Sequence, residues 1–304
     1  MSVYDVIVLG GGPAGLSAAL YAQRAGVSVL VLEQTMYGGQ MMSTPDIENY
    51  PGVPKLSGVD LVMQFYQQVT DLGVEILLEG PQSVELTGPV KEVRTAANTY
   101  RGRTVIIANG AQRRKLGVPG EEALAGSGIS YCATCDGALY KGKEVAIVGG
   151  GDTALEDALF LANHCSRVHL IHRRDAFRGG KLLAQAVTAR ENIQIHYDSV
   201  TEEVHGDPRV EAISLRNVKT QETTRLEVSG VFVAIGLEPQ NQIFAGQVEL
   251  DPAGYILAGE DCRTNLPGVY AAGDTRTKTI RQIVTAASDG AIAAIEAANL
   301  VNAG

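Results

Sequence analysis

Short continuous hydrophobic runs, rather than one long alternating pattern, mark the first third of the chain. Three runs rich in β-branched residues predict buried strands of a parallel sheet, at residues 4–9, 27–32 and 104–108. Apolar residues at helical spacing fill residues 16–25 and 61–72. Residues 74–100 carry shorter runs separated by turn residues, which predicts a small antiparallel layer.

The same order of elements returns in the second half. We predict strands at 144–148 and 167–171 around a helix at 155–162, followed by strands and turns over 193–228 and a strand at 231–235. The chain therefore holds two copies of one strand–turn–helix–strand pattern.

The end of the chain is too short to form a third domain. It has one predicted strand near residues 268–272 and an alanine-rich helix at 282–300, so it is expected to complete the first domain. The predicted fold is α/β, with two Rossmann-like (three-layer ββα) dinucleotide-binding domains, the second inserted into the first. Turn signals near residue 117 and at Glu238-Pro239 mark the boundaries. The expected domains are residues 1–115 together with 244–304, and residues 116–243.

A glycine-rich turn follows the first strand of each predicted domain and precedes a helix. The first turn has the form G-x-G-x-x-G and contains Gly10, Gly12, Pro13, Ala14 and Gly15. The next strand ends at Glu33, followed by Gln34. Such glycines let a pyrophosphate reach the helix N-terminus, and the carboxylate can bind ribose hydroxyls. The whole arrangement predicts a dinucleotide site.

The second copy differs from the first at the position expected to contact the ribose of the nucleotide. Its members are Gly149, Gly151, Asp152 and Thr153, with Ala154 in place of the last glycine. An offset of 23 residues separates Gly10 from Glu33, and the same offset separates Gly149 from His172. The basic residues that begin there are His172, Arg173, Arg174 and Arg178. Guanidinium groups would bind a 2′-phosphate that a carboxylate would repel, which predicts NADPH rather than NADH. A solvated basic patch is the alternative.

Two cysteines separated by two residues, Cys132 and Cys135, lie near the middle of the chain, with Asp136 directly after them. Such a pair can alternate between dithiol and disulfide, and the carboxyl could transfer the protons. Half of a zinc site is the competing interpretation, but it needs more ligands, and Cys165 and Cys262 stand alone. A structural disulfide would restrain the chain little, because the loop is short. We therefore expect redox chemistry and no metal.

Composition narrows the class of protein. The 304 residues are 45% hydrophobic and 19% charged, with a net charge of −9 and a pI near 5.1. An acidic balance argues against nucleic acid or an anionic membrane as a partner. Four cysteines are too few for a disulfide scaffold, and we see no signal peptide or spanning segment, so a cytoplasmic protein is expected.

The motifs constrain one another. Nicotinamide donates two electrons as a hydride, and a flavin can accept them and pass them to sulfur. The first fingerprint would therefore bind FAD and the second NADPH. The expected path runs from NADPH through FAD to the Cys132–Cys135 pair and then to an external disulfide.

Taken together, the motifs resemble the bacterial thioredoxin reductases of the low-molecular-weight type. The resemblance rests on the sequence Cys-Ala-Thr-Cys-Asp-Gly from Cys132 to Gly137, on the paired fingerprints, on the basic run, and on Gly273-Asp274 before Arg281-Gln282. It covers the chain nearly from end to end.

The resemblance implies particular roles. Cys135 would lie against the flavin, Cys132 would attack the substrate disulfide, and Asp136 would donate and accept the proton. Further contacts with FAD are implied for Gly38, Gly39, Gln40, Asn49, Asp274, Arg281, Gln282 and Ile283. The family also implies thioredoxin as the protein substrate, and a homodimer in which the NADPH domain rotates.

Three positions depart from the common pattern. Asn109 stands where many relatives have Thr, Ile283 where some have Ala, and Asp152 where Asn is frequent. A carboxylate near a pyrophosphate is unfavourable, so Asp152 leaves the affinity for NADPH open.

Other functions stay open as well. The chain could be a related flavin disulfide reductase or oxidase for a different protein or a small dithiol. A protein of another class, a redox-sensing flavoprotein without turnover, would carry the same motifs. Larger glutathione-reductase-like enzymes fit less well, because no histidine follows His205 and the cysteine pair has a different spacing and place.

Overall fold

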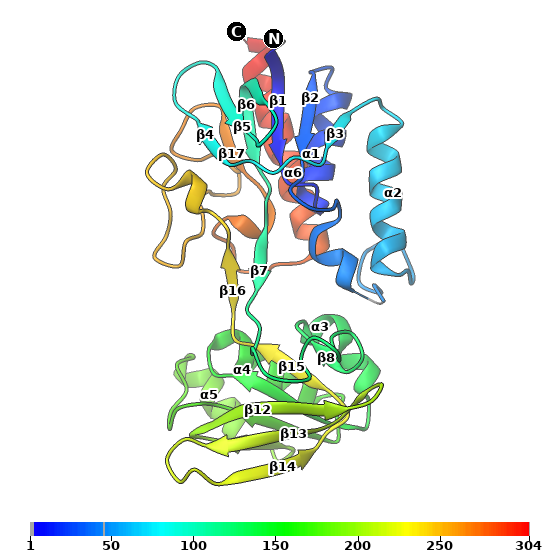
Figure 1. Cartoon of the computed structure of the whole chain (residues 1–304), viewed down its shortest axis with the longest axis vertical. Helices are drawn as coiled ribbons and strands as arrows, with labels where there is room; N and C mark the ends of the chain where they lie inside the picture. The colour runs from blue at the N-terminus through cyan, green and yellow to red at the C-terminus, as the bar shows by residue number, and fades with distance from the viewer. Residues whose placement is uncertain (1–2, 45, 304) are drawn as a thin grey trace. The chain divides into compact units, whose positions relative to one another are not determined.

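The computed structural model describes residues 3–44 and 46–303, and contacts between residues divide the chain into two compact units (Figure 1). Unit 1 combines the N-terminal part, up to Gln112, with the C-terminal part, from Glu238. Unit 2 runs from Arg113 to Leu237, and is thus inserted into unit 1 as predicted. It ends beside the Glu238-Pro239 turn signal, before the expected position at residue 243.

The stretch 117–120, which carries the turn signals expected to mark the first boundary, belongs to unit 2. The N–H of Gly117 donates to the carboxylate of Glu121 at 2.7 Å, and Glu121 is only 1% exposed. The carbonyl of Pro119 accepts from the N–H of Val204 at 3.0 Å. Because these bonds hold the segment within unit 2, the chain passes between the units a few residues earlier.

Unit 1 is built on a seven-stranded sheet in the order β3-β2-β1-β6-β5-β4, with β17 beside β6. Its strands are β1 (Val3–Leu9), β2 (Val29–Leu32), β3 (Glu75–Leu77), β4 (Ser83–Glu85), β5 (Lys91–Arg94), β6 (Thr99–Ile107) and β17 (Val269–Ala271). Only β5 pairs antiparallel, with β4 and β6. β3 pairs parallel with β2, which corrects the expectation of a purely antiparallel layer over 74–100. The helix between β2 and β3 makes a crossover connection, and such a connection returns the chain parallel.

The parallel strands bury both faces, and this makes unit 1 a three-layer structure. Val6 and Val8 pack in the cluster that includes the helical residues of α1 and α6. Their neighbours Ile7 and Leu9 pack on the opposite face, with residues such as Phe244. Side chains alternate along a strand, so a continuous hydrophobic run fills both cores.

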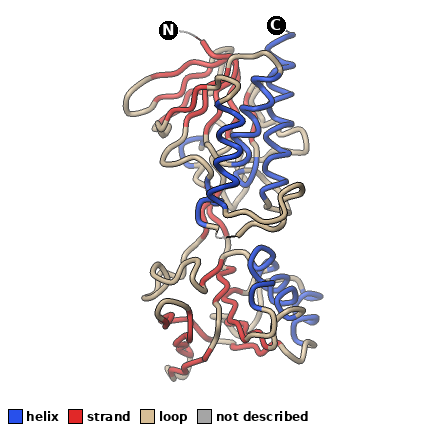
Figure 2. The backbone as a smooth tube through the Cα atoms, turned by 90° about the vertical axis from the view of Figure 1, so that its right-hand side faces the viewer, coloured by secondary structure: helices blue, strands red, loops and turns tan. Residues whose placement is uncertain are grey.

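The helices of unit 1 are α1 (Pro13–Arg24), α2 (Gly58–Thr70) and α6 (Ile283–Ala303), and they run side by side in Figure 2. α1 begins at Pro13 rather than at residue 16, because proline is favourable at the first helical position. The Ser17 hydroxyl donates to the Ala287 carbonyl at 2.7 Å. α6 is long and apolar enough to span a membrane by length and composition, but its buried face packs against α1 within unit 1.

Unit 2 repeats the plan on a five-stranded parallel sheet in the order β11-β10-β9-β15-β8. Its strands are β8 (Ile129–Ser130), β9 (Glu144–Gly149), β10 (Arg167–Ile171), β11 (Ile193–His196) and β15 (Val231–Ala234). A three-stranded antiparallel layer of β12 (Ser199–Gly206), β13 (Val210–Asn217) and β14 (Thr223–Glu227) covers one face. The helices are α3 (Ala133–Asp136), α4 (Asp152–Ala162) and α5 (Lys181–Thr188).

The remaining elements are short. β7 (Ala111–Arg113) and β16 (Leu237–Pro239) pair where the chain leaves and re-enters unit 1. The 3₁₀ turns are η1 (Gly39–Ser43), η2 (Gly137–Tyr140), η3 (Gln242–Phe244) and η4 (Gly273–Thr275).

Candidate functional site

The first glycine-rich turn has no room for side chains at two of its three glycines. Gly10 has φ +112°, and a Cβ there would lie 2.5 Å from the carbonyl oxygen of Ala108. A Cβ on Gly15 would lie 1.8 Å from the carbonyl oxygen of Gly10. A Cβ on Gly12 would meet no atom within 4 Å, so open space lies beside this residue. The turn is therefore tightly packed except where the fingerprint predicts a phosphate.

Glu33 closes the turn from the end of β2. Its Oε2 accepts from the N–H of Gly11 at 2.6 Å, and its Oε1 accepts from the N–H of Thr35 at 3.0 Å. Gln34 is exposed and lies against Gly80 instead. The structure thus places Glu33, but not Gln34, directly on the turn.

The loop after β2 lies beside the same turn. The N–H of Gly38 donates to the carbonyl of Gly11 at 2.7 Å, and a Cβ on Gly39 would lie 3.5 Å from the Cα of Gly12. Gly38 has φ +105°, a conformation that favours glycine. These contacts bring the Gly38-Gly39 pair to the first fingerprint.

Four more of the expected residues have contacts within unit 1. The Gln40 amide donates to the carbonyl of Ala111 at 2.7 Å. Asn49 Nδ2 donates to Gln282 Oε1 at 3.1 Å, which links residues 233 positions apart. Ile283 packs in the small apolar cluster that contains Met41 and Leu61.

The segment after β17 completes this side of unit 1. A Cβ on Gly273 would lie 2.9 Å from the Ala14 Cβ, which places the Gly273-Asp274 turn against the start of α1. The Asp289 carboxylate accepts from Gly273 N at 2.9 Å, Arg276 Nη2 at 2.8 Å and Lys278 Nζ at 2.8 Å. Although burial opposes ionisation, the two cations hold the pKa of Asp289 below its ordinary value. This buried charge cluster fixes the segment that leads to Arg281.

The buried polar atoms of this region that have no hydrogen-bond partner among the described residues include Asn109 Oδ1 and Arg281 Nε. The Arg281 guanidinium lies 4.3 Å from the centre of the Tyr255 ring. One orphan is an acceptor and the other a donor, so a polar ligand could satisfy both. The sequence did not indicate Tyr255, because the contact joins two separate loops.

In unit 2 the second turn is equally tight. A Cβ on Gly149 would lie 2.5 Å from the carbonyl oxygen of Ala234, whereas Gly151 has only Arg178 Nη2 in reach, at 3.5 Å. Asp152 starts α4, and its Oδ1 accepts from the N–H of Gly180 at 2.6 Å. Thr153 is exposed on the first turn of the helix. The carboxylate of Asp152 thus already has a backbone donor within the protein.

His172 differs from the arginines that follow it. It is 8% exposed, and its two ring nitrogens lie 3.0 Å from the carbonyl oxygens of Gly149 and Ala176. A Cβ on Gly150 would lie 2.1 Å from its Nδ1. The buried histidine therefore supports the backbone of the turn. Arg173, Arg174 and Arg178, in contrast, are exposed.

The cysteine pair is a disulfide at the start of α3. Cys132 and Cys135 have their Cα atoms 5.3 Å apart, and Cys132 is the N-cap residue of α3. The Cys132 sulfur lies 3.5 Å from the hydroxyl of Thr134. Both cysteines are half-buried, and the remaining cysteines, Cys165 and Cys262, are buried free thiols. The pair thus has the form that the redox interpretation requires.

Ser130 is a contributor that the sequence did not reveal. Its hydroxyl donates to Asp136 Oδ2 at 2.5 Å and accepts from the N–H of Cys132 at 3.1 Å. The residue is 5% exposed at the end of β8. A serine two positions before the first cysteine was the only signal available, and it is too common to decide anything alone.

No three His, Cys, Asp or Glu side chains within residues 3–44 and 46–303 are arranged to hold a metal ion. Cys165 is not activated as a nucleophile, because burial raises the pKa of its thiol to about 11.

Comparison with known proteins gives one consistent result. The family model of the pyridine nucleotide-disulphide oxidoreductases matches residues 4–290. A thioredoxin reductase of Mycolicibacterium smegmatis is 45% identical over 298 residues, which cover 97% of this chain and 96% of that protein. A thioredoxin reductase of Streptomyces coelicolor is 43% identical over 97% of this chain and 93% of its own length.

Solved structures agree with the sequence relatives. The crystal structure of thioredoxin reductase from Streptococcus pyogenes has a TM-score of 0.94 and 40% identity, and the match covers 99% of each chain. Thioredoxin reductase from Giardia duodenalis also gives a TM-score of 0.94, with 35% identity over 99% of this chain and 100% of that chain.

Proposed function

Because this chain belongs to the thioredoxin reductases, within the pyridine nucleotide-disulphide oxidoreductase family, we propose that it reduces the disulfide of a thioredoxin with electrons from NADPH. The observation that carries the proposal is the Cys132–Cys135 disulfide, set in a chain with two nucleotide fingerprints. A flavin disulfide reductase for another protein or a small dithiol is the nearest alternative.

FAD belongs in unit 1. The tight turn at Gly10, the open space beside Gly12 and the Glu33 carboxylate suit its adenosine and pyrophosphate. The orphan atoms Asn109 Oδ1 and Arg281 Nε support a polar group bound among these loops. The other residues assigned to this site are Gly15, Gly38, Gly39, Gln40, Asn49, Asp274, Gln282 and Ile283.

NADPH belongs in unit 2, on the turn at Gly149 and Gly151. Arg173, Arg174 and Arg178 supply the charge for its 2′-phosphate, and His172 acts by holding the turn, since both its ring nitrogens face backbone carbonyls. When both cofactors are bound, NADPH supplies a hydride and FAD relays the two electrons to the cysteine pair.

The chain's own sulfur chemistry then follows. Two electrons and two protons convert the Cys132–Cys135 disulfide to two thiols. The Cys132 thiolate attacks one sulfur of the substrate disulfide, which forms a mixed disulfide and releases one substrate thiolate. Cys135 attacks Cys132, releases the second substrate thiolate and restores the disulfide. Asp136, oriented by Ser130, takes and returns a proton at each turn of this cycle.

The decisive experiment compares NADPH oxidation by the wild type and by Cys135→Ser, with oxidised thioredoxin and a dithiol reporter. We expect the variant to retain its yellow colour and lose turnover. Cys165→Ala is the matched control, since it removes a buried free thiol and should keep activity. Undiminished reporter reduction by Cys135→Ser would overturn the assignment, and wild-type turnover with a small dithiol but not with thioredoxin would favour the alternative.

The proposed assembly is a homodimer formed through unit 1. A cavity of about 430 Å³ lies between α1, α2 and α6, and its lining combines polar side chains such as Gln68 with apolar ones such as Leu20, Phe65 and Val284. Tyr21 on its edge is 43% exposed. Sedimentation velocity should show a dimer for the wild type and a monomer for Tyr21→Glu, and a monomeric wild type would contradict the proposal.

A cytoplasmic location is part of the same proposal. A disulfide that must be reduced in each catalytic cycle needs a supply of NADPH, and the two free thiols are compatible with a reducing compartment.

A further inference from the structure

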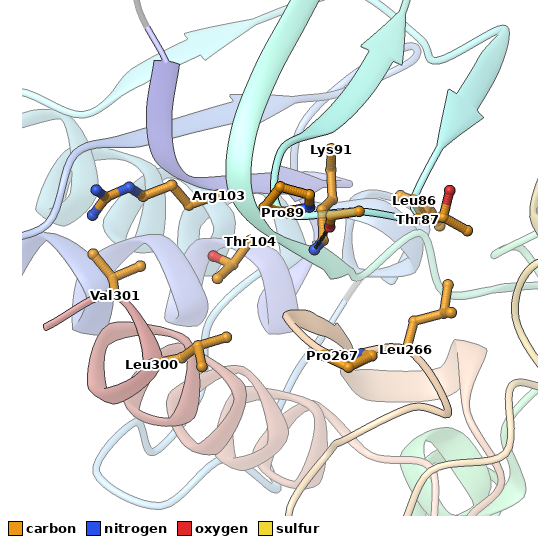
Figure 3. A pocket seen from close by; sticks show the side chains of 11 residues that line it. Leu86, Thr87, Pro89, Lys91, Arg103, Thr104, Leu266, Pro267, Leu300 and Val301 are labelled. Atoms are coloured by element: carbon orange, nitrogen blue, oxygen red, sulfur yellow. Dashed lines mark hydrogen bonds between the residues drawn. The ribbon is translucent and has the colours of Figure 1, made fainter. Parts of the chain in front are cut away.

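A second cavity of unit 1, of about 570 Å³, is lined by no residue of either fingerprint or of the cysteine pair (Figure 3). The strand residues Lys91 of β5 and Arg103 and Thr104 of β6 line one side. Leu300 and Val301, at the C-terminal end of α6, line the other. No activity described above uses these residues.

Lys91 occupies a position where an apolar residue is expected. Alternation along β5 places it on the same face as Val93, which is fully buried in the core of unit 1. Lys91 itself is 4% exposed. A lysine is almost never buried to this degree unless it is paired.

The Lys91 ammonium has no carboxylate partner among the described residues. Its Nζ donates to the carbonyl oxygen of Gly88 at 2.6 Å, and a Cβ on Gly268 would lie 3.3 Å from it. Loss of solvent lowers the pKa of this amine below its ordinary value. One neutral acceptor does not compensate a buried charge, so an anion at this point would be stabilised.

The charge around the cavity is of one sign. Arg103 is the second cation, and its nearest carboxylate, Asp5, lies 3.7 Å away and is not among the lining residues. None of the described residues that line the cavity is acidic. In Figure 3 the Lys91 side chain points toward Leu266 and Pro267, with its nitrogen at the tip.

Apart from the two threonines, Thr87 and Thr104, the rest of the lining is apolar. Leu86, Leu266, Leu300 and Val301 contribute hydrophobic surface around the cations. A ligand for this cavity therefore needs a negative charge at one end and an apolar body. A fully hydrated inorganic anion would pair with the cations but would make no favourable contact with the apolar residues of the cavity.

We propose that this cavity binds a small aliphatic carboxylate, whose carboxylate pairs with Lys91 and whose hydrocarbon chain lies against Leu266, Leu300 and Val301. The site is independent of the proposed reductase activity, since it shares no residue with the nucleotide turns or the cysteine pair. Binding there stabilises unit 1 by mass action.

The test is calorimetric titration of the full-length, flavin-loaded protein with hexanoate. A ligand of this size is expected to bind with a Kd on the order of 1 mM. Lys91→Met keeps the length of the side chain and removes the charge, so it should weaken binding at least tenfold. Lys141→Met is the matched control, because Lys141 is an exposed lysine of unit 2 and its loss should leave Kd unchanged.

Thermal unfolding supplies a second readout that does not depend on enzyme turnover. Hexanoate at ten times its wild-type Kd should raise the Tm of the wild type by about 2 °C and that of Lys91→Met by less than about 1 °C. Equal binding by the wild type and Lys91→Met would overturn the proposal. So would the absence of hexanoate binding up to 20 times the expected Kd, or binding of inorganic phosphate alone. If Lys91→Met fails to fold, Leu300→Glu, which places a carboxylate on the exposed apolar side of the cavity, must abolish hexanoate binding by charge repulsion.

Discussion

Ser130 shows how much of the site chemistry depends on one small side chain. It connects the end of β8 to both the backbone of Cys132 and the carboxylate of Asp136. A proton-transfer group works only when it is held within reach of its partner, so the orienting hydroxyl matters as much as the carboxyl. Because Ser130 is buried, water does not compete for the hydrogen bond between its hydroxyl and Asp136.

Ser130→Ala should lower kcat with thioredoxin by about tenfold to a hundredfold, because Asp136 loses its orienting donor. The loss should be larger at the pH extremes, where the proton acceptor or donor is scarce. Steady-state rates measured across pH would show this. Ser130→Thr keeps the hydroxyl and should restore most of the rate, and an unchanged pH profile in Ser130→Ala would show that the serine is only structural.

The exposed arginines after β10 allow a second test at the same scale. The double variant Arg173→Ala, Arg174→Ala should raise KM for NADPH about a hundredfold and affect KM for NADH little, since only NADPH carries the 2′-phosphate. Arg167→Ala removes one exposed guanidinium from the other end of β10 and serves as the control for loss of positive charge. Equal effects on the two nucleotides would show that the arginines do not bind the phosphate.

At the scale of elements, the two glycine-rich turns are equivalent in position and differ in what surrounds them. Gly12 and Gly151 are the N-cap residues of α1 and α4, and neither glycine has a positive φ. A methyl group at either position is compatible with the backbone. It would occupy the space where each fingerprint predicts a phosphate.

Gly12→Ala should therefore yield a folded but colourless protein, because nothing in unit 1 meets the added Cβ. The ratio of flavin absorbance to protein absorbance measures the loss. Gly151→Ala is the matched control: it should remain yellow and show a raised KM for NADPH. Full flavin content in Gly12→Ala would place the pyrophosphate elsewhere.

The close contact between α1 and α6 leaves no room for a side chain at another glycine, Gly290. A Cβ on Gly290 would lie 2.1 Å from the carbonyl oxygen of Ala14 and 2.9 Å from the N atom of Ala18. Both are backbone atoms, so the helices would have to separate. Gly290→Ala should cost about 3 kcal/mol of unfolding free energy, against a gain of about 1 kcal/mol from helix propensity.

Urea unfolding would measure this difference. Asn299→Ala, at an exposed position of the same helix, should change stability by less than about 0.5 kcal/mol. A Gly290→Ala protein as stable as the wild type would mean that the helices pack less closely than the structure indicates.

At the scale of the whole molecule, stability against acid depends on partly buried titratable groups whose effects have opposite signs. Burial, with Glu156 nearby, raises the pKa of Asp157 to about 6. Burial and then His169 lower the pKa of His196 to about 4. Between pH 4 and 6 the folded protein binds more protons than the unfolded chain at Asp157, and fewer at His196.

Asp157 thus makes the protein less stable as the pH rises through 6, and His196 makes it less stable as the pH falls from 6.5 toward 4. The two effects have opposite signs, and each changes the free energy of unfolding by about 1–3 kcal/mol over its pH range. Asp157→Asn should therefore be more stable than the wild type at pH 7 and lose stability more steeply on acidification. Urea midpoints at pH 4.5, 5.5, 6.5 and 7.5 would test this, with His196→Gln expected to show the reverse slope.

The insertion of unit 2 into unit 1 also belongs to this scale. It requires β17 and α6 to return from the end of the chain, and β17 pairs with β6 in parallel register. The prediction of this return was confirmed, because a lone strand and helix cannot bury their apolar faces unaided. The exact boundary was less predictable: residues 117–120 have the composition of a linker but are held by Glu121 and Val204 of unit 2.

Local sequence determined the features that depend on neighbouring residues. Continuous apolar runs produced the buried strands, glycines at fixed spacing produced the turns at Gly10 and Gly149, and two nearby cysteines produced the redox pair. These are short-range effects of sterics and hydrophobic burial, and can be read from a single stretch of chain.

Tertiary structure decided everything that joins distant residues. It directed both ring nitrogens of His172 to carbonyl oxygens, set Arg281 over Tyr255, and left the Lys91 ammonium buried without a carboxylate among the described residues. Each depends on which segments pack together and on how much water they exclude. Residue type and spacing carry no record of either, because the energy of a buried polar group is set by its partners in space.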